Sequence, residues 1–183
     1  MSSIFFATSN RNKFQEASKV LSDAGIPVEH FPFQHREIRS DSLEEIAHEA
    51  AEEAYRRCQK PVFVEDSGLF IETLNGFPGT YSAWALKKIG TGGILKLMEG
   101  VKDRTAYFEA CIAYHDGNEI RSFMGRCEGS IALAQRGRQG FGYDPIFMPK
   151  DVELTFAESI DLKNKLSHRY ISLLEFSKSL KLR

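Results

Sequence analysis

The sequence has few features that would indicate a disulfide framework, secretion or a membrane. Its 183 residues include only three cysteines, Cys58, Cys111 and Cys127, and none forms a Cys-x-x-Cys pair. An odd number of widely separated cysteines indicates neither disulfides nor a zinc site, so we expect reduced, partly buried thiols. No run approaches the roughly 18 apolar residues of a membrane span, and a signal-peptide pattern is lacking. The sequence therefore predicts a cytoplasmic protein with no membrane partner.

An excess of charge of one sign is also lacking. The 24 Lys and Arg residues balance 25 Asp and Glu residues, which leaves a formal net charge of −1. A chain without a general basic field is poorly suited to nucleic acid, so we expect no nucleic-acid partner. The His-Glu-x-x-His zinc pattern is absent, and Gly90-Thr91-Gly92-Gly93 lacks the lysine of a Walker phosphate loop. These absences exclude the zinc-hydrolase and P-loop motifs.

What the sequence does have is an alternation of strand and helix patterns. With 42% hydrophobic and 27% charged residues, the composition is that of a soluble globular chain, and the length suits one domain, residues 1–183. The patterns predict an α/β fold with a mixed sheet. Expected strands are 3–8, 27–31, 61–65, 105–114, 119–127 and 130–134; expected helices are 14–21, 42–58, 81–99 with a break at 90–93, and 161–180, with Leu162, Leu166, Tyr170, Leu173 and Leu174 inward.

Two adjacent carboxylates follow a short apolar run in segment 61–68. Glu65 and Asp66 stand at the carboxyl end of the predicted buried strand, just before Ser67-Gly68. Carboxylates at such an edge are costly to desolvate unless a cation meets them, and ligands of α/β proteins bind at this edge. Mg²⁺ held by carboxylate and substrate phosphate fits the pattern, as does a solvated strand-to-turn junction. Both side chains converge only if the chain turns at Ser67-Gly68.

The start of the chain has a strand, a polar turn and a helix, which is a pattern typical of an anion site. Residues 4–7 give the strand signal, residues 8–12 form the turn, and Lys13 lies in the first turn of the helix. Backbone N–H groups at a helix N-terminus favour anions, and a lysine there opposes the helix dipole unless a phosphate binds. Ordinary N-capping by Asn10 or Asn12 with an exposed lysine is the alternative.

Two later segments have features typical of a binding site. The first has an aromatic ring between two glycines, and the second has a group of cations. Phe141 lies between two glycines, which lets its ring approach a flat ligand and stack on it. Lys163, His168 and Arg169 enter the C-terminal helix and suit anions or the edge of a base. The alternative for the Phe141 segment is a tight turn whose aromatic ring packs in the core. The alternative for Lys163, His168 and Arg169 is a solvated helix face.

Together these segments resemble the inosine/xanthosine triphosphate pyrophosphatases, a family of house-cleaning nucleotide hydrolases. The resemblance runs in order from about residue 4 to about residue 180. It implies an elongated mixed sheet in two lobes flanked by helices, with a nucleotide cleft between the lobes, and usually a homodimer. It also implies hydrolysis of ITP, dITP and XTP to the monophosphate and pyrophosphate with Mg²⁺. The segments that match are Thr8–Lys13, Glu65–Gly68, Gly76–Ser82, Phe141–Pro145 and Ser167–Arg169, with Lys163 ahead of the last.

The resemblance implies a role for each group. Asp66 would bind Mg²⁺ and orient or deprotonate the attacking water, with Glu65 as a second candidate base. Cationic and backbone groups would hold the triphosphate, Phe141 would stack on the base, and His168 and Arg169 would lie near the base edge or the α-phosphate. The implied substrate-binding residues are Thr8, Ser9, Asn10, Arg11, Asn12, Lys13, Ser67, Phe141, Gly142, Tyr143, Asp144, Lys163, His168 and Arg169.

The chain departs from the family pattern at two positions. Some members carry a lysine on the helix before the metal strand, and Ala50 stands there in this chain. Arg56 or Arg57, or the lysines of the other motifs, would have to replace it. The second metal carboxylate matches Glu37, more loosely because no proline precedes it.

Two other functions remain open from the sequence. One is a pyrophosphatase for modified pyrimidine or methylated nucleotides, which is the Maf-like substrate range. The other is a nucleotide sensor without activity. Retention of both Glu65 and Asp66 argues against the sensor, because binding of a triphosphate does not require two acids.

Overall fold

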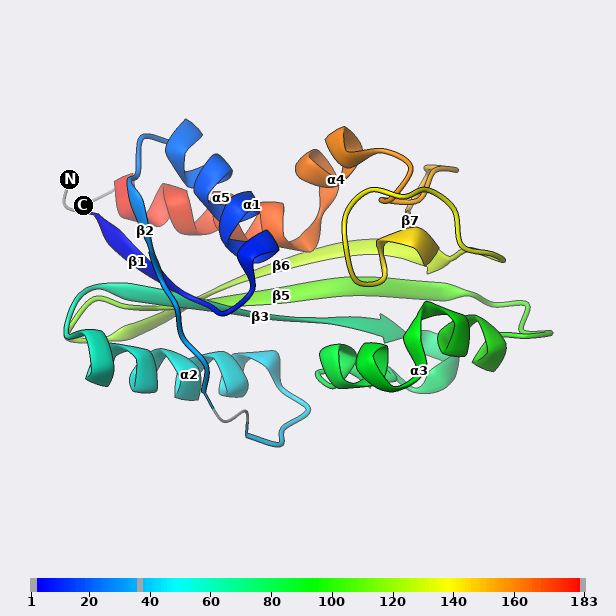
Figure 1. Ribbon diagram of the computed structural model, residues 1–183, viewed down its shortest axis with the longest axis horizontal. Coiled ribbons are helices and arrows are strands. Elements are labelled where there is room, and N and C mark those ends of the chain that lie inside the picture. Colours follow the sequence, from blue (N-terminus) through cyan, green and yellow to red (C-terminus); the bar gives the residue numbers. More distant parts are fainter. Residues whose placement is uncertain (1–2, 36–37, 182–183) are drawn as a thin grey trace. The chain divides into compact units, whose positions relative to one another are not determined.

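The computed structural model describes residues 3–35 and 38–181 (Figure 1). None of the helices in these two ranges combines the length and the apolar character that a membrane crossing requires. In chain order the elements are β1 (Ile4–Ala7), α1 (Arg11–Asp23), β2 (Val28–Phe31), α2 (Leu43–Cys58), β3 (Val62–Ile71), a short 3₁₀ helix (Glu72–Leu74), β4 (Pro78–Gly79), α3 (Ser82–Leu97), β5 (Thr105–His115), β6 (Ile120–Ile131), a second short 3₁₀ helix (Asp144–Ile146), β7 (Phe147–Pro149), α4 (Ile160–Leu166) and α5 (His168–Lys181).

The strands form one sheet in the hydrogen-bonded order β2-β1-β3-β5-β6-β7, and β4 pairs with β3. Strand β1 is parallel to both β2 and β3. Strand β4 is antiparallel to β3, and β7 is antiparallel to β6. Parallel and antiparallel pairs together make a mixed sheet, so the predicted α/β class is confirmed. The nucleotide cleft between lobes stays a prediction.

The chain divides into two compact units, which are described separately. Unit 1 contains the chain up to Asp66, Ala110–Gly125 and the chain from Arg169 onward. Unit 2 contains Ser67–Glu109 and Arg126–His168. The boundaries fall within continuous strands, since β3, β5 and β6 each contribute residues to both units.

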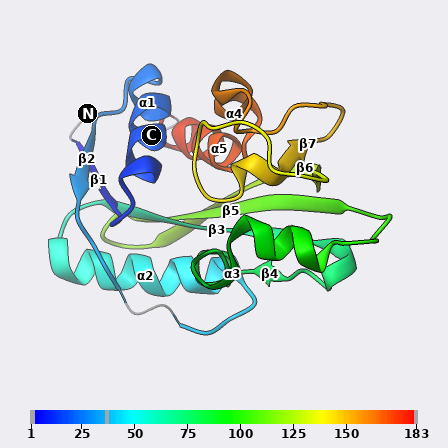
Figure 2. The same ribbon diagram turned by 45° about the vertical axis from the view of Figure 1, so that its right-hand side comes forward.

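In unit 1, helices cover both faces of the strands. Helices α1 and α5 lie on one side of β1 and β2, and α2 lies on the other (Figures 1 and 2). On the α1 side, the ring of Phe6 stacks on that of Phe63 at 4.3 Å between centroids, and Phe176 of α5 packs on Phe63 at 5.1 Å. Helix α2 begins as predicted, because the Ser42 hydroxyl accepts a hydrogen bond from the Glu45 N–H at 3.3 Å.

In unit 2, the core is built from β3, β5, β6 and β7 with residues of α3 and of the loop before α4. Phe147 lies edge-on to Phe108, with their ring centroids 4.6 Å apart, and Phe156 packs on both rings. Helix α3 is broken at Gly90, whose φ of 63° and ψ of −175° are not helical. This break is where the run of glycines predicts it.

Three predicted elements differ from the structure. Strand β3 does not end at residue 65 but continues to Ile71, and residues 130–134 form no separate strand because β6 itself extends to Ile131. The C-terminal helix is split at Ser167, which is extended with φ −67° and ψ 151°. Leu166, which the amphipathic pattern places inward, is consequently 38% exposed, whereas Lys163 is buried.

Gly68 explains why β3 continues instead of turning. A Cβ atom at this position would lie 2.3 Å from the carbonyl oxygen of Gly79 in β4. The glycine therefore permits the close approach of a neighbouring strand. Close approach of another backbone is a common reason for glycine within a strand, besides the turn that the sequence suggested. The two short strands β4 and β7 were not predicted, because strands of two or three residues carry too few side chains to show a periodicity.

The cysteines behave as expected from their number and spacing. All three are free thiols. Cys111 and Cys127 are buried, and burial raises the pKa of each thiol to about 12. These two side chains therefore stay protonated at neutral pH and serve as packing residues.

Candidate functional site

The polar turn after β1 is held in a fixed conformation by its own side chains. The Asn10 carboxamide oxygen accepts hydrogen bonds from the N–H groups of Asn12 at 3.0 Å and Lys13 at 3.2 Å. The Thr8 hydroxyl accepts one from the Asn10 N–H at 3.1 Å. His30 of β2 is bonded to the Thr8 carbonyl oxygen at 2.8 Å. The turn is thus an Asn10-capped helix N-terminus, with Lys13 in its first turn.

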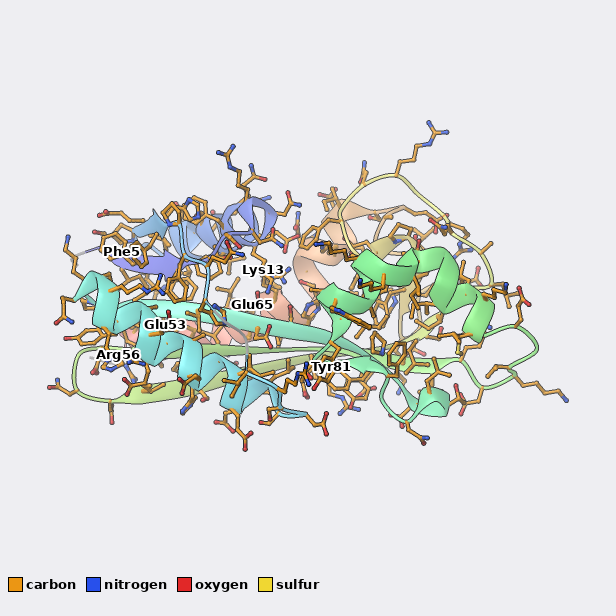
Figure 3. All side chains as sticks on the ribbon, turned by 60° about the horizontal axis from the view of Figure 1, so that its bottom comes forward. Phe5, Lys13, Glu53, Arg56, Glu65 and Tyr81 are labelled. Atoms are coloured by element: carbon orange, nitrogen blue, oxygen red, sulfur yellow. The ribbon has the colours of Figure 1, made fainter. Side chains whose placement is uncertain are left out.

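Lys13 is not an exposed surface lysine. Its ammonium lies 3.0 Å from Oε2 of Glu65 and donates a hydrogen bond to the Glu65 carbonyl oxygen at 3.1 Å. The Lys13 and Glu65 side chains point toward one another from α1 and β3 (Figure 3). The Glu65 side chain is 1% exposed. The motif lysine and the motif glutamate therefore meet directly in unit 1, although they are far apart in the sequence.

Arg169 brings a second cation to the same glutamate. Its Nη2 lies 3.2 Å from Oε1 of Glu65, and its Nη1 lies 2.6 Å from Oε2 of Glu16 on α1. The Arg169 side chain is 4% exposed. Burial works to lower the pKa of the guanidinium, but the charges of Glu65 and Glu16 outweigh burial and raise this pKa. Arg169 is thus a permanent cation between two carboxylates.

Glu65 and Asp66 project to opposite faces of the sheet. Successive residues of a strand alternate between its faces, and β3 runs through both residues without a turn. Glu65 shares the face of Phe63, which packs on α5, while the half-buried Asp66 lies on the other face. The condition for convergence of the two carboxylates, a turn at Ser67-Gly68, is not met.

Unit 2 brings together Phe141, Asp144 and Lys163. The Lys163 ammonium is 2.7 Å from Oδ2 of Asp144 and 4.0 Å from the centroid of the Phe141 ring. The same carboxylate oxygen accepts a hydrogen bond from the Phe141 N–H at 2.8 Å. The side chains of Lys163 and Asp144 are 2% and 5% exposed. Asp144 therefore holds both the backbone at Phe141 and the buried ammonium of Lys163 in place.

The other predicted residues in unit 2 are Tyr143, His168, Gly142 and Ser67. Burial raises the pKa of the Tyr143 phenol to about 12, and its hydroxyl donates to the Ser82 carbonyl oxygen at 2.8 Å. The buried His168 ring stacks on Phe108 at 4.6 Å. Gly142 has a φ of 69°, a backbone conformation that favours glycine. Ser67 is half-buried on β3.

The position of the family's helix lysine is occupied by Ala50, and the candidate replacements Arg56 and Arg57 lie on α2. Ala50 is 2% exposed and packs in the core of unit 1. Arg57 pairs with Glu53 on the same helix. Arg56 is exposed, and its Nε donates to the Glu52 carbonyl oxygen at 3.4 Å. The Arg57 guanidinium also lies over the ring of Phe33, 5.1 Å from its centroid. The replacement of the helix lysine by an arginine or by the lysines of the other motifs stays a prediction.

Sequence reasoning missed Glu16, His30 and Phe108. Glu16 lies three residues after Lys13, so the spacing that places both on one face of α1 was a usable signal. Its partner Arg169 lies at the other end of the chain, and nothing local indicates the pair. His30 of β2 is bonded to the Thr8 carbonyl oxygen, and Phe108 of β5 stacks on His168 of α5. Both contacts join elements that are distant in the sequence, so only the fold defines them.

The carboxylates fit a magnesium ion that is shared with a substrate. Within residues 3–35 and 38–181, no three His, Cys, Asp or Glu side chains gather to hold a metal by themselves. Mg²⁺ commonly uses only one or two carboxylates and takes its other ligands from phosphates and water. Asp66 suits this arrangement, because Glu65 already carries two cations. The second predicted ligand, Glu37, lies outside the described residues.

Comparisons with known proteins agree with these motifs. A sequence model described as Ham1 family matches residues 4–179. The chain is 48% identical to a dITP/XTP pyrophosphatase of Thermococcus kodakarensis, over 96% of either chain, and 44% identical to one of Saccharolobus solfataricus, over 94% and 91%. A solved HAM1 protein of Coxiella burnetii is 29% identical, with a TM-score of 0.86 over 100% of both chains. Since the family match and the identities extend over nearly all of the sequence, the chain belongs to the Ham1 family.

Proposed function

We propose that this protein hydrolyses the non-standard purine nucleotides dITP, XTP and ITP to the nucleoside monophosphate and pyrophosphate. The observation that carries the proposal is the contact of Lys13, at the capped N-terminus of α1, with Glu65, the residue before Asp66. The contact brings the N-terminal end of α1 next to β3, which supports an anion site beside the predicted metal carboxylate. Relatives named dITP/XTP pyrophosphatase, at 44–48% identity, support the choice of substrate.

Unit 1 is proposed to hold the phosphates and activate water. Phosphoryl transfer depends mainly on positioning and on neutralising charge. Lys13 and the backbone of residues 8–12 supply positive potential at the helix N-terminus. Asp66 would orient the attacking water and take its proton. A Mg²⁺ ion bound by Asp66 and the phosphates, with Glu37 as a second ligand, would neutralise negative charge on the triphosphate.

Glu65 has a different role in this proposal. Its carboxylate is buried between Lys13 and Arg169, and both of its oxygens have a cationic neighbour. A base in that setting would have to give up two ion pairs to bind a proton. Asp66 is therefore the preferred base, and the assignment of Glu65 as a second base is kept only as the weaker prediction.

Unit 2 is proposed to bind the base. The Phe141 ring would stack on the purine, an interaction worth about 1–3 kcal/mol. The Lys163 ammonium already lies over this ring, which favours a role near the base over the predicted contact with the triphosphate. Arg169 is engaged by Glu16 and Glu65, so donors to the 6-oxo group would come from the Phe141 loop, including Gly142, and from the region of His168.

A homodimer and a cytoplasmic location belong to the same proposal. They are supported by the resemblance to the pyrophosphatase family. A single domain of residues 1–183 is likewise proposed, since one family model matches residues 4–179.

A panel of nucleotides tests the proposed substrate class. With Mg²⁺ present, we expect kcat/KM for pyrophosphate release to be highest for dITP, ITP and XTP, much lower for GTP, and lowest for ATP and pyrimidine nucleotides. The reason is that donors aimed at a 6-oxo group are left unpaired by a 6-amino group. Comparable kcat/KM for ATP and ITP would contradict this base selection. Binding of nucleotides without any pyrophosphate release would favour the sensor.

A further inference from the structure

We infer that Ser82 is a positioning residue for recognition of the base, which acts through Tyr143 on the loop that carries Phe141. The inference rests on the proposed function, because it names a further residue that binding of the same substrate requires. Ser82 is the buried first residue of α3. It belongs to unit 2, together with β4 and the loop 141–145.

The Ser82 hydroxyl links two strands of the sheet. It accepts a hydrogen bond from the Leu69 N–H of β3 at 2.8 Å and donates one to the Gly79 carbonyl oxygen of β4 at 2.7 Å. Leu69 and Gly79 are register partners in the antiparallel pair of these strands. A hydroxyl can donate and accept at the same time, so one side chain fixes the first residue of α3 against both strands.

The strands at this point are closely packed. Leu69 and Gly79 are buried, and a Cβ atom at Gly68 would lie 2.3 Å from the same Gly79 carbonyl oxygen. Gly68 therefore lets this carbonyl group approach β3, and the Ser82 hydroxyl binds it there. Loss of the hydroxyl would remove a hydrogen bond from a buried N–H and a buried carbonyl, and such a loss is costly in the interior of a protein.

The carbonyl oxygen of Ser82 ties the base loop to α3. The Tyr143 hydroxyl donates to it at 2.8 Å. Tyr143 is buried, and burial raises the pKa of its phenol to about 12, so this donor stays protonated at neutral pH. Within the loop, the Asp144 N–H donates to the Phe141 carbonyl oxygen at 3.3 Å. The Tyr143–Ser82 bond thus connects the loop to α3, and the Ser82 hydroxyl connects α3 to β3 and β4.

A change at Ser82 should therefore disturb binding of the base and spare the phosphate site. Ser82, Tyr143 and Phe141 belong to unit 2, whereas Lys13 and Asp66, the groups proposed to act on the phosphates, belong to unit 1. An interaction with a part of the substrate that does not react contributes equally to binding of the ground state and the transition state. Its loss raises KM and leaves kcat nearly unchanged.

The test replaces Ser82 with alanine and compares XTP with pyrophosphate, the proposed product, which has no base. We expect KM for XTP to rise roughly tenfold, a change within the range of a base-stacking contact, while the inhibition constant of pyrophosphate stays unchanged. Ser82→Thr, which keeps the hydroxyl, should recover part of the loss. The matched control is Ser22→Ala, at an exposed position on α1, which should leave both constants unchanged.

A second variant breaks the same link at its other end and tests the inference even where Ser82→Ala does not fold. Tyr143→Phe should also raise KM for XTP, and the double variant should raise it no further than the worse single change. An unchanged KM, an equal loss of binding for XTP and pyrophosphate, or additive losses would each overturn the inference. A wild-type protein without activity would instead contradict the proposed function, so the two failures are distinguishable.

Discussion

Replacing Asp66 with asparagine is expected to lower kcat for XTP by roughly 10²–10⁴-fold, the range for loss of a general base. The substitution keeps the shape of the side chain but removes the charge that accepts a proton or binds a cation. Asp66 is half-buried on the sheet face opposite the ion-paired Glu65. An isosteric change at a half-buried position should leave the fold of unit 1 intact.

The control for this variant is Asp23→Asn. Asp23 is the exposed last residue of α1, and it receives the same chemical change away from β3. Steady-state kinetics and the unfolding temperature of both variants decide the outcome. A near-normal kcat in Asp66→Asn would show that another carboxylate is the base, with Glu65 or Glu37 the first to test.

Replacing Asp144 with asparagine is expected to reduce the free energy of unfolding by about 3–5 kcal/mol, which is typical of breaking a buried ion pair. The change removes the carboxylate charge that lies 2.7 Å from the Lys163 ammonium, and that side chain is only 2% exposed. It also weakens the hydrogen bond from the Phe141 N–H, so base stacking should suffer at temperatures where the protein remains folded. Urea unfolding and kcat/KM for XTP measure the two effects.

Two further variants show whether charge is the cause. Asp151→Asn makes the same change at an exposed position with a φ of 61°, which asparagine tolerates well, and should leave stability nearly unchanged. Adding Lys163→Met to Asp144→Asn removes the buried cation as well and should restore part of the lost stability. A double variant less stable than Asp144→Asn alone would contradict the account of this pair.

Local signals were sufficient for the parts of the fold that depend on neighbouring residues. The capping box at Ser42 and Glu45 predicts the start of α2, and the structure begins that helix at Leu43. Asn10 was one of two expected caps of α1, and it makes the predicted side-chain hydrogen bonds. The glycine run at 90–93 predicts the break in α3.

Features that depend on distant partners could not be predicted in this way. Gly68 has the appearance of a turn residue, and only the carbonyl of Gly79 shows that it serves strand packing. Lys163 was predicted to face a ligand, with a solvated helix face as the alternative, because lysine is almost never fully buried unless it is paired. The structure pairs it with Asp144 in the interior of unit 2, a partner that lies 19 residues away and that no local pattern indicates.

The site was predicted as a set of residues but not as an arrangement. The motifs identify Lys13, Glu65 and Arg169, and the sequence assigns all three to substrate or catalysis. The structure shows that they bind one another, with Glu16 as an additional member. The difference arises because a motif records which residue types occur, whereas the pairing of buried charges is decided by which elements pack together.

The identity of the released phosphate tests the central claim most directly. Purified protein with Mg²⁺ and XTP or dITP would be assayed for pyrophosphate and orthophosphate separately, with Asp66→Asn prepared in parallel to detect contaminating hydrolases. The proposed reaction predicts pyrophosphate in an amount equal to the nucleoside monophosphate formed, no activity in the presence of chelator, and recovery on adding Mg²⁺. Orthophosphate and nucleoside diphosphate as the primary products would contradict it.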